Sequence, residues 1–233
     1  MKSIYVKSII TIIALTILSS IAVADVISFE TPDNTFMDGQ PVDAQVTFTT
    51  GTDSITVVLE NLQIDPKSVV QNLSGLVFSI SSGENSGTVT SSSGLPRTID
   101  NDGVYSDGAA VDTGWELGTL GEALHLHVLG TDIGPAHTLI GYPNGSDLYS
   151  NAKGSIAGNK PHNPFLAESA TFVLDIPGVT EDSTILGVTF EFNTSPGSTV
   201  TVGEPPLIPE PATLSLLAFG GLLILKRQRR RRS

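Results

Sequence analysis

The sequence has no cysteine, a single tryptophan and few basic residues. Without cysteine the chain can form neither a disulfide nor a thiolate metal site, so a folded domain must depend on its hydrophobic core. Between positions 25 and 208 the only basic residues are Lys67, Arg97, Lys153 and Lys160, against 23 acidic ones, a net charge near −19. Such an acidic stretch excludes nucleic acid and anionic lipid as partners.

Charged residues make up only 15% of the chain, whereas Gly, Ser, Thr and Val are frequent. Apolar and polar side chains alternate with a period of two in several stretches, as in strands with one buried face. In one of them Leu186, Val188 and Phe190 are expected to face the core. Clusters of Gly, Ser, Asn and Asp separate the stretches and indicate turns. The stretches are 45–49, 55–60, 76–80, 171–176 and 186–193.

We therefore predict an all-β domain over residues 25–202, built as an antiparallel two-sheet sandwich such as a jelly roll. A single-sheet β-solenoid is the alternative. One short helix is expected, because Asp65 suits an N-cap, Pro66 suits the first helical position and 67–73 contains no helix breaker.

Residues 1–24 have the pattern of a secretory signal peptide, which predicts an N-terminal signal helix. Lys2 and Lys7 supply the positive start, and a mainly apolar run follows. Ala22 and Ala24 fit the small-x-small rule, so signal peptidase is expected to cut before Asp25. A retained N-terminal membrane anchor is the alternative.

The other end begins with a proline-rich linker at 203–211, which should be extended and stiff. Residues 212–225 form an uncharged run of 14 residues. As a helix it would span ~21 Å, less than the ~30 Å hydrocarbon core. Lys226 and Arg227 can snorkel and so extend the effective span, and the basic tail at 226–233 should stay on the cytoplasmic side. This order predicts a transmembrane helix at 212–225, with the acidic domain outside.

The segment Ile208-Pro209-Glu210-Pro211-Ala212-Thr213-Leu214, the apolar run and the arginine tail together resemble the PEP-CTERM sorting signal. The resemblance implies recognition by exosortase, a membrane-embedded cysteine protease that removes the tail and passes the protein to the cell surface or biofilm matrix. It implies that Pro209, Glu210 and Pro211 are the recognition residues. The stop-transfer block would be Lys226, Arg227, Arg229, Arg230, Arg231 and Arg232.

Three internal segments, 65–73, 152–159 and 161–165, also resemble exosortase-dependent surface proteins of unassigned function. That resemblance implies no catalytic residues. From the residues themselves, the segment Pro161-His162-Asn163-Pro164-Phe165 is expected to form a rigid loop whose His162 or Asn163 caps neighbouring strands.

Two sets of residues are candidates for a metal ion. On a strand His125 and His127 would share one face about 7 Å apart and could bind one ion together. A third ligand could come from Glu122, Asp132 or His137. The alternative is a hydrogen-bonded or solvent-facing pair.

The second candidate is the acidic turn at 100–108, where Asp100, Asp102 and Asp107 offer oxygen ligands to calcium. Its spacing differs from that of an EF-hand. The alternative is a solvated turn in which the aspartates bond to the backbone.

No nucleophile elbow, phosphate loop or dinucleotide fingerprint occurs in the sequence. The domain is therefore expected to be non-catalytic and without a cofactor, and its expected partners are signal peptidase, exosortase, the membrane and extracellular polysaccharide. A carbohydrate- or calcium-binding module is one alternative, and a hydrolase is another. Trp115 is expected in the core rather than as a platform for sugar stacking.

Overall fold

The computed structural model describes residues 26–130, 137–160, 162–195 and 199–205. Several predictions fall outside these residues, and the structure does not bear on them. They are the signal peptide at 1–24 with Ala22 and Ala24, the sorting residues Pro209, Glu210 and Pro211, the membrane helix at 212–225, the basic tail at 226–233 and Asp132.

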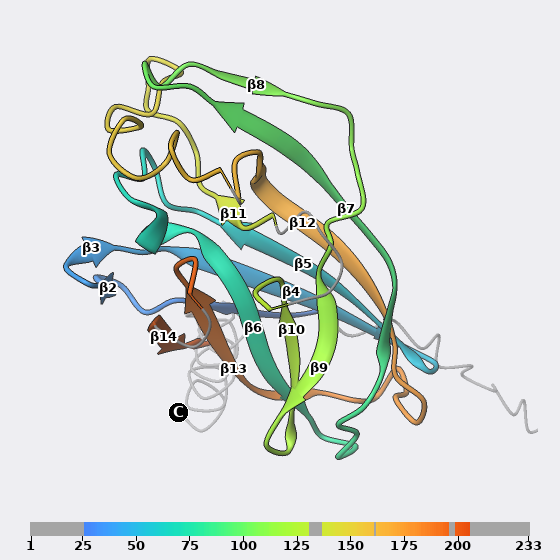
Figure 1. The fold of residues 1–233 in the computed structure, drawn as a ribbon. Helices are drawn as coiled ribbons and strands as arrows, with labels where there is room; N and C mark the ends of the chain where they lie inside the picture. The colour runs from blue at the N-terminus through green and yellow to red at the C-terminus, as the bar shows by residue number, and fades with distance from the viewer. Residues whose placement is uncertain (1–25, 131–136, 161, 196–198, 206–233) are drawn as a thin grey trace, which may run out of the picture.

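Strands dominate the described residues, which confirms the prediction of an all-β protein (Figure 1). The elements are β1 (Val26–Glu30), β2 (Phe36–Met37), β3 (Gln40–Pro41), β4 (Ala44–Gly51), β5 (Ser54–Asn61), the 3-10 turn η1 (Val69–Gln71), β6 (Leu73–Ile80), β7 (Thr88–Ile99), β8 (Tyr105–Asp107), β9 (Glu116–Leu120), β10 (Ala123–His127), β11 (Leu139–Ile140), β12 (Phe165–Asp175), β13 (Ile185–Phe192) and β14 (Thr199–Val202).

Twelve of these strands belong to one hydrogen-bonded sheet, and β2 and β3 form a separate hairpin. The main path runs β1-β4-β5-β12-β11-β6-β10-β9, and all pairs are antiparallel except β11 with β12. Two side branches leave this path: β13 and β14 from β6, and β7 and β8 from β12. β6 and β12 each form hydrogen bonds with three strands, so the sheet branches at these two strands.

The sheet curves around one main hydrophobic core. Phe48 on β4 contacts Phe78 on β6 with ring centroids 5.1 Å apart, although these strands are far apart along the hydrogen-bonded path. Trp115 is buried and its ring lies 5.3 Å from that of Phe172, while its indole N–H donates to the His137 carbonyl. The expectation that Trp115 belongs to the core is confirmed.

The five predicted stretches of alternation coincide with β4, β5, β6, β12 and β13, although the last two stretches extend one residue beyond their strands, to Ile176 and Asn193. The inward assignment of Leu186 is wrong, however, because this side chain is 67% exposed. The pairing of β13 with β6 shifts register between Ile185 and Gly187, so Ile185 takes the core position instead. A bulge of this kind reverses the side-chain alternation at one point of a strand.

The prediction of a helix that starts at Asp65 is also wrong, because only the single 3-10 turn η1 forms there. Its N-cap is Ser68, whose hydroxyl accepts the Val70 N–H, and the Gln71 side chain accepts the N–H groups of Lys67 and Ser68. Asp65 has a φ of 49° and so cannot start a helix. The chain enters β6 at Leu73, which leaves no room for a longer helix.

A second, smaller core includes side chains from the long segment that follows β11, whose course is drawn in Figure 1. The Asn163 amide donates to the Ile99 carbonyl and accepts the Ile99 N–H, so this side chain acts as a strand partner at the end of β7. The buried residues of this core are Val69, Ile99, Ile140, Tyr149, Ala152, Ile156 and Phe165.

The first and last described segments are joined by backbone hydrogen bonds. The Glu30 N–H donates to the Glu204 carbonyl and the Glu204 N–H donates to the Glu30 carbonyl, both at 2.8 Å. The end of β1 and the last described residues therefore lie side by side.

Candidate functional site

A buried arginine connects four segments where β7 meets β12. Arg97 is 4% exposed, and its Nε–H and Nη2–H donate to the two carboxylate oxygens of Asp107 on β8, each at 2.7 Å. Its Nη1 donates to Glu168 Oε1 on β12 and to the Tyr149 hydroxyl, each at 2.9 Å. The guanidinium also lies 4.1 Å from the centroid of the Tyr105 ring. A charge buried this deeply needs such a full set of partners.

Burial and hydrogen bonding oppose each other in setting the pKa values of this cluster. Burial lowers the pKa of Arg97, but its bonds with Asp107, Tyr149 and Glu168 outweigh burial and raise the pKa above its usual value. Burial raises the pKa of Tyr149 to about 12, against the lowering effect of Arg97. Arg97 therefore stays charged at neutral pH, and Tyr149 keeps the proton that it donates to the Gly141 carbonyl.

A surface pocket of about 290 Å³ adjoins this cluster. It lies over an irregular stretch of β12 between the pairs Leu166–Pro96 and Ala170–Gly94, where β12 has two residues more than β7. Glu168, in the middle of this bulge, has a φ of 62°. The pocket is lined by Ser93, Leu95, Arg97, Asp107, Glu168 and Thr171, among others.

Sequence reasoning missed this cluster because its members are distant along the chain. Arg97 lies 10, 52 and 71 residues from Asp107, Tyr149 and Glu168 respectively. One signal was present, since Arg97 is one of only four basic residues between positions 25 and 208. In so acidic a domain, an isolated arginine within a strand is a candidate for a paired, buried charge.

His125 and His127 lie side by side on β10, as predicted, and their rings stack with centroids 4.3 Å apart. The Nε2–H of His125 donates to Glu191 Oε2 on β13 at 2.7 Å, and the Nδ1–H of His127 donates to the Leu129 carbonyl at 3.1 Å. Glu191 reaches His125 by crossing β6 at Gly75, where any Cβ would overlap the carboxylate. The structure thus gives His125 a carboxylate partner that sequence reasoning did not identify.

Burial is the main cause of a lowered pKa at His127, and the adjacent His125 acts in the same direction. Glu116 and Glu191 oppose these two effects. Neither described candidate for a third metal ligand beside His125 and His127 is shown to join them. Glu122 lies in the exposed turn before β10, and the buried His137 ring bonds to the Pro164 carbonyl.

The predicted acidic turn at 100–108 comprises the connection after β7 at 100–104 and then β8 itself. Asp100 Oδ1 accepts the N–H groups of Asp102 and Val104, each at 2.9 Å, while Asp107 pairs with Arg97. These contacts are those of an Asx turn followed by an ion pair. Among the residues that the structure describes, no three His, Asp or Glu side chains are grouped so that they could hold a metal ion.

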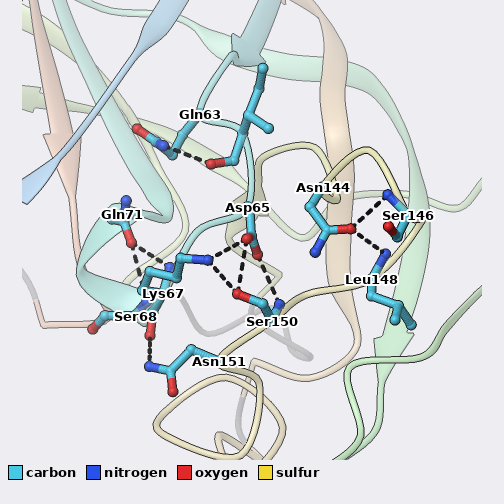
Figure 2. A network of polar contacts seen from close by, with 11 residues as sticks. Gln63, Asp65, Lys67, Ser68, Gln71, Asn144, Ser146, Leu148, Ser150 and Asn151 are labelled. Atoms are coloured by element: carbon cyan, nitrogen blue, oxygen red, sulfur yellow. Dashed lines mark hydrogen bonds and ion pairs between the residues drawn. The ribbon is translucent and has the colours of Figure 1, made fainter.

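A polar network joins η1 to the long segment after β11 (Figure 2). Asp65 accepts the N–H and the hydroxyl of Ser150, at 2.8 and 2.9 Å, and Lys67 contacts both residues. Asn151 donates to the Lys67 carbonyl at 2.8 Å, and Ser155 accepts the Val69 N–H. Burial raises the pKa of Asp65, but the bonds from Lys67 and Ser150 prevail and lower it. The network joins residues 65–69 to residues 150–155.

A comparison of the chain with protein-family models, curated proteins and solved structures finds no match. Helical structure within the described ranges is limited to one 3-10 turn, so no helix there is long and apolar enough for a membrane crossing.

Proposed function

We propose that the chain is an exported surface or biofilm-matrix protein that exosortase sorts and cleaves through its PEP-CTERM signal. Signal peptidase would remove residues 1–24, and residues 212–225 would hold the protein in the inner membrane until exosortase cuts near Pro209–Ala212. The domain between the two signals would reach the outside without a catalytic role of its own.

The observation that carries this proposal is the position of the domain boundaries relative to the two signals. β1 begins at Val26, just after the expected cleavage site, and β14 ends at Val202, just before the proline-rich linker. Among the described residues, the main core lies between Phe29 and Phe192. The pairing of Glu30 with Glu204 brings the end of β1 next to the last described residues, so the segments that lead to the two proposed cuts start from neighbouring parts of the domain.

For the domain itself we propose a two-sheet antiparallel sandwich, with β1, β4, β5, β12 and β7 in one layer and β13, β6, β10 and β9 in the other. The contact between Phe48 and Phe78 supports it, because side chains from opposite layers meet in the core of a sandwich. The net charge near −19 between positions 25 and 208 favours solubility outside the cell and disfavours adhesion to anionic lipid.

Mass spectrometry of the protein exported by cells with and without exosortase tests the proposal. With exosortase, the released protein should begin at Asp25 and end near Pro209–Ala212. Without it, the full C-terminal tail should remain, and the protein should stay in the membrane fraction.

Variants in the linker make the test specific to the sorting residues. Replacing Pro209, Glu210 and Pro211 by alanine should block release, whereas the matched control Pro205→Ala/Pro206→Ala should be released like the wild type. Release of both variants with intact tails, or retention of both, would contradict the proposal.

A further inference from the structure

The pocket beside Arg97 has features that strand pairing alone does not require. The bulge in β12 separates it from β7 over residues 167–169, and Glu168 adopts a left-handed backbone conformation that non-glycine residues rarely take. Bulges and strained residues are frequent next to binding sites, where they aim a side chain. Here the backbone turns Glu168 toward Arg97.

Arg97 fixes the two carboxylates that border the pocket. Asp107 is held at both oxygens, and Glu168 is held at Oε1, while its Oε2 has no donor among the described residues. The carboxylates remain partly accessible, with side-chain exposures of 32% and 29%. Because Arg97 already holds these carboxylates in place, little side-chain entropy would be lost when a ligand binds, and this favours affinity.

The charges beside the pocket define what it can accept. One guanidinium and two carboxylates leave a net charge of −1, and the strongly acidic domain adds repulsion against anions. Ser93 and Thr171, which carry hydroxyl groups, line the same pocket, together with the exposed Leu95 and with Ala110. A matching ligand would bring a cation, several hydroxyl groups and a small apolar face.

We propose that this pocket binds an amino sugar with a free ammonium group, as one unit of a cationic polysaccharide. The ammonium would pair with Glu168 Oε2, the sugar hydroxyls would bond to Asp107 and Ser93, and the C–H face of the ring would rest on Leu95. The volume of about 290 Å³ is at the small end for ligand pockets and suits a single small unit. This proposal does not depend on the sorting route.

Calorimetry on the full chain in detergent micelles tests the proposal with three matched oligosaccharides: a glucosamine tetramer, its N-acetylated form and a galacturonate tetramer. The glucosamine tetramer should bind in a saturable, salt-sensitive manner, and each of the others at least tenfold more weakly. Equal binding of the acetylated tetramer, or no binding of the glucosamine tetramer, would overturn the proposal.

Two variants assign the binding to the pocket. Glu168→Gln should weaken binding at least tenfold, whereas the control Asp182→Asn, at an exposed carboxylate outside the pocket lining, should leave it unchanged. Ser93→Trp would fill the pocket from an exposed position and keep both carboxylates, and it should also abolish binding. Unfolding curves would verify that each variant is folded, and equal losses in Asp182→Asn and Glu168→Gln would show nonspecific attraction instead.

Discussion

Replacing Arg97 by methionine tests how far the buried cluster stabilises the domain. The substitution keeps much of the side-chain volume but removes four hydrogen bonds and the contact with the Tyr105 ring. Breaking a fully buried ion pair costs about 3–5 kcal/mol. Asp107 and Glu168 are about one-third exposed and can regain water, so we expect a loss near the lower end, about 3 kcal/mol.

Thermal unfolding followed by circular dichroism measures this loss. In a domain of this size 1 kcal/mol corresponds to roughly 2–4 °C, so Tm should fall by about 6–12 °C. The triple variant Arg97→Met/Asp107→Leu/Glu168→Gly removes all three charges and the strained φ, and it should recover most of the loss. A change below about 1 kcal/mol in Arg97→Met would refute the view that the cluster is a major stabilising contact.

Two further predictions concern the outer face of β6 and β10. Gly75→Ala should lower the free energy of unfolding by about 1–3 kcal/mol in denaturant titrations, because the new methyl overlaps Glu191 Oε2. Gly187→Ala on β13 meets open space and serves as the control; equal losses would contradict this reasoning. Folding lowers the pKa of His127. As pH falls, His127 therefore takes up a proton in the unfolded chain at a higher pH than in the folded protein, which favours unfolding. Stability should therefore be lost below about pH 6.5, and less so in His127→Gln, as Tm measured against pH would show. Parallel pH profiles of the two proteins would rule out this role for His127.

Strand positions could be predicted because the pattern that encodes them is local. Phe48 and Val57 are fully buried, as expected for alternation over one buried face. Leu186 was misplaced because a single extra residue in the pairing reverses that alternation, and nothing in the neighbouring sequence marks the shift. The failed helix at Asp65 has a different cause, because here a local signal competed: Ser68 and Gln71 form a capping box that begins three residues later.

The contacts around the candidate sites could not be predicted, because they join residues that only the tertiary fold brings together. The two histidines were correctly placed on one strand, but Glu191 lies 66 residues from His125. Gly75 carried a partial signal, since a glycine inside a strand often marks the close approach of another group. The identity of that group depends on which strand pairs with β6.

The hydrogen bonds between Glu30 and Glu204 have a practical consequence for engineering. Because the two ends of the folded domain are adjacent, a short linker could join them, and new termini could be opened in the exposed turn at 81–83. Circular permutation of this kind is tolerated where ends are close and the new break lies in a surface turn. The permuted domain should keep its strand pairing and could display a fused peptide at the new termini.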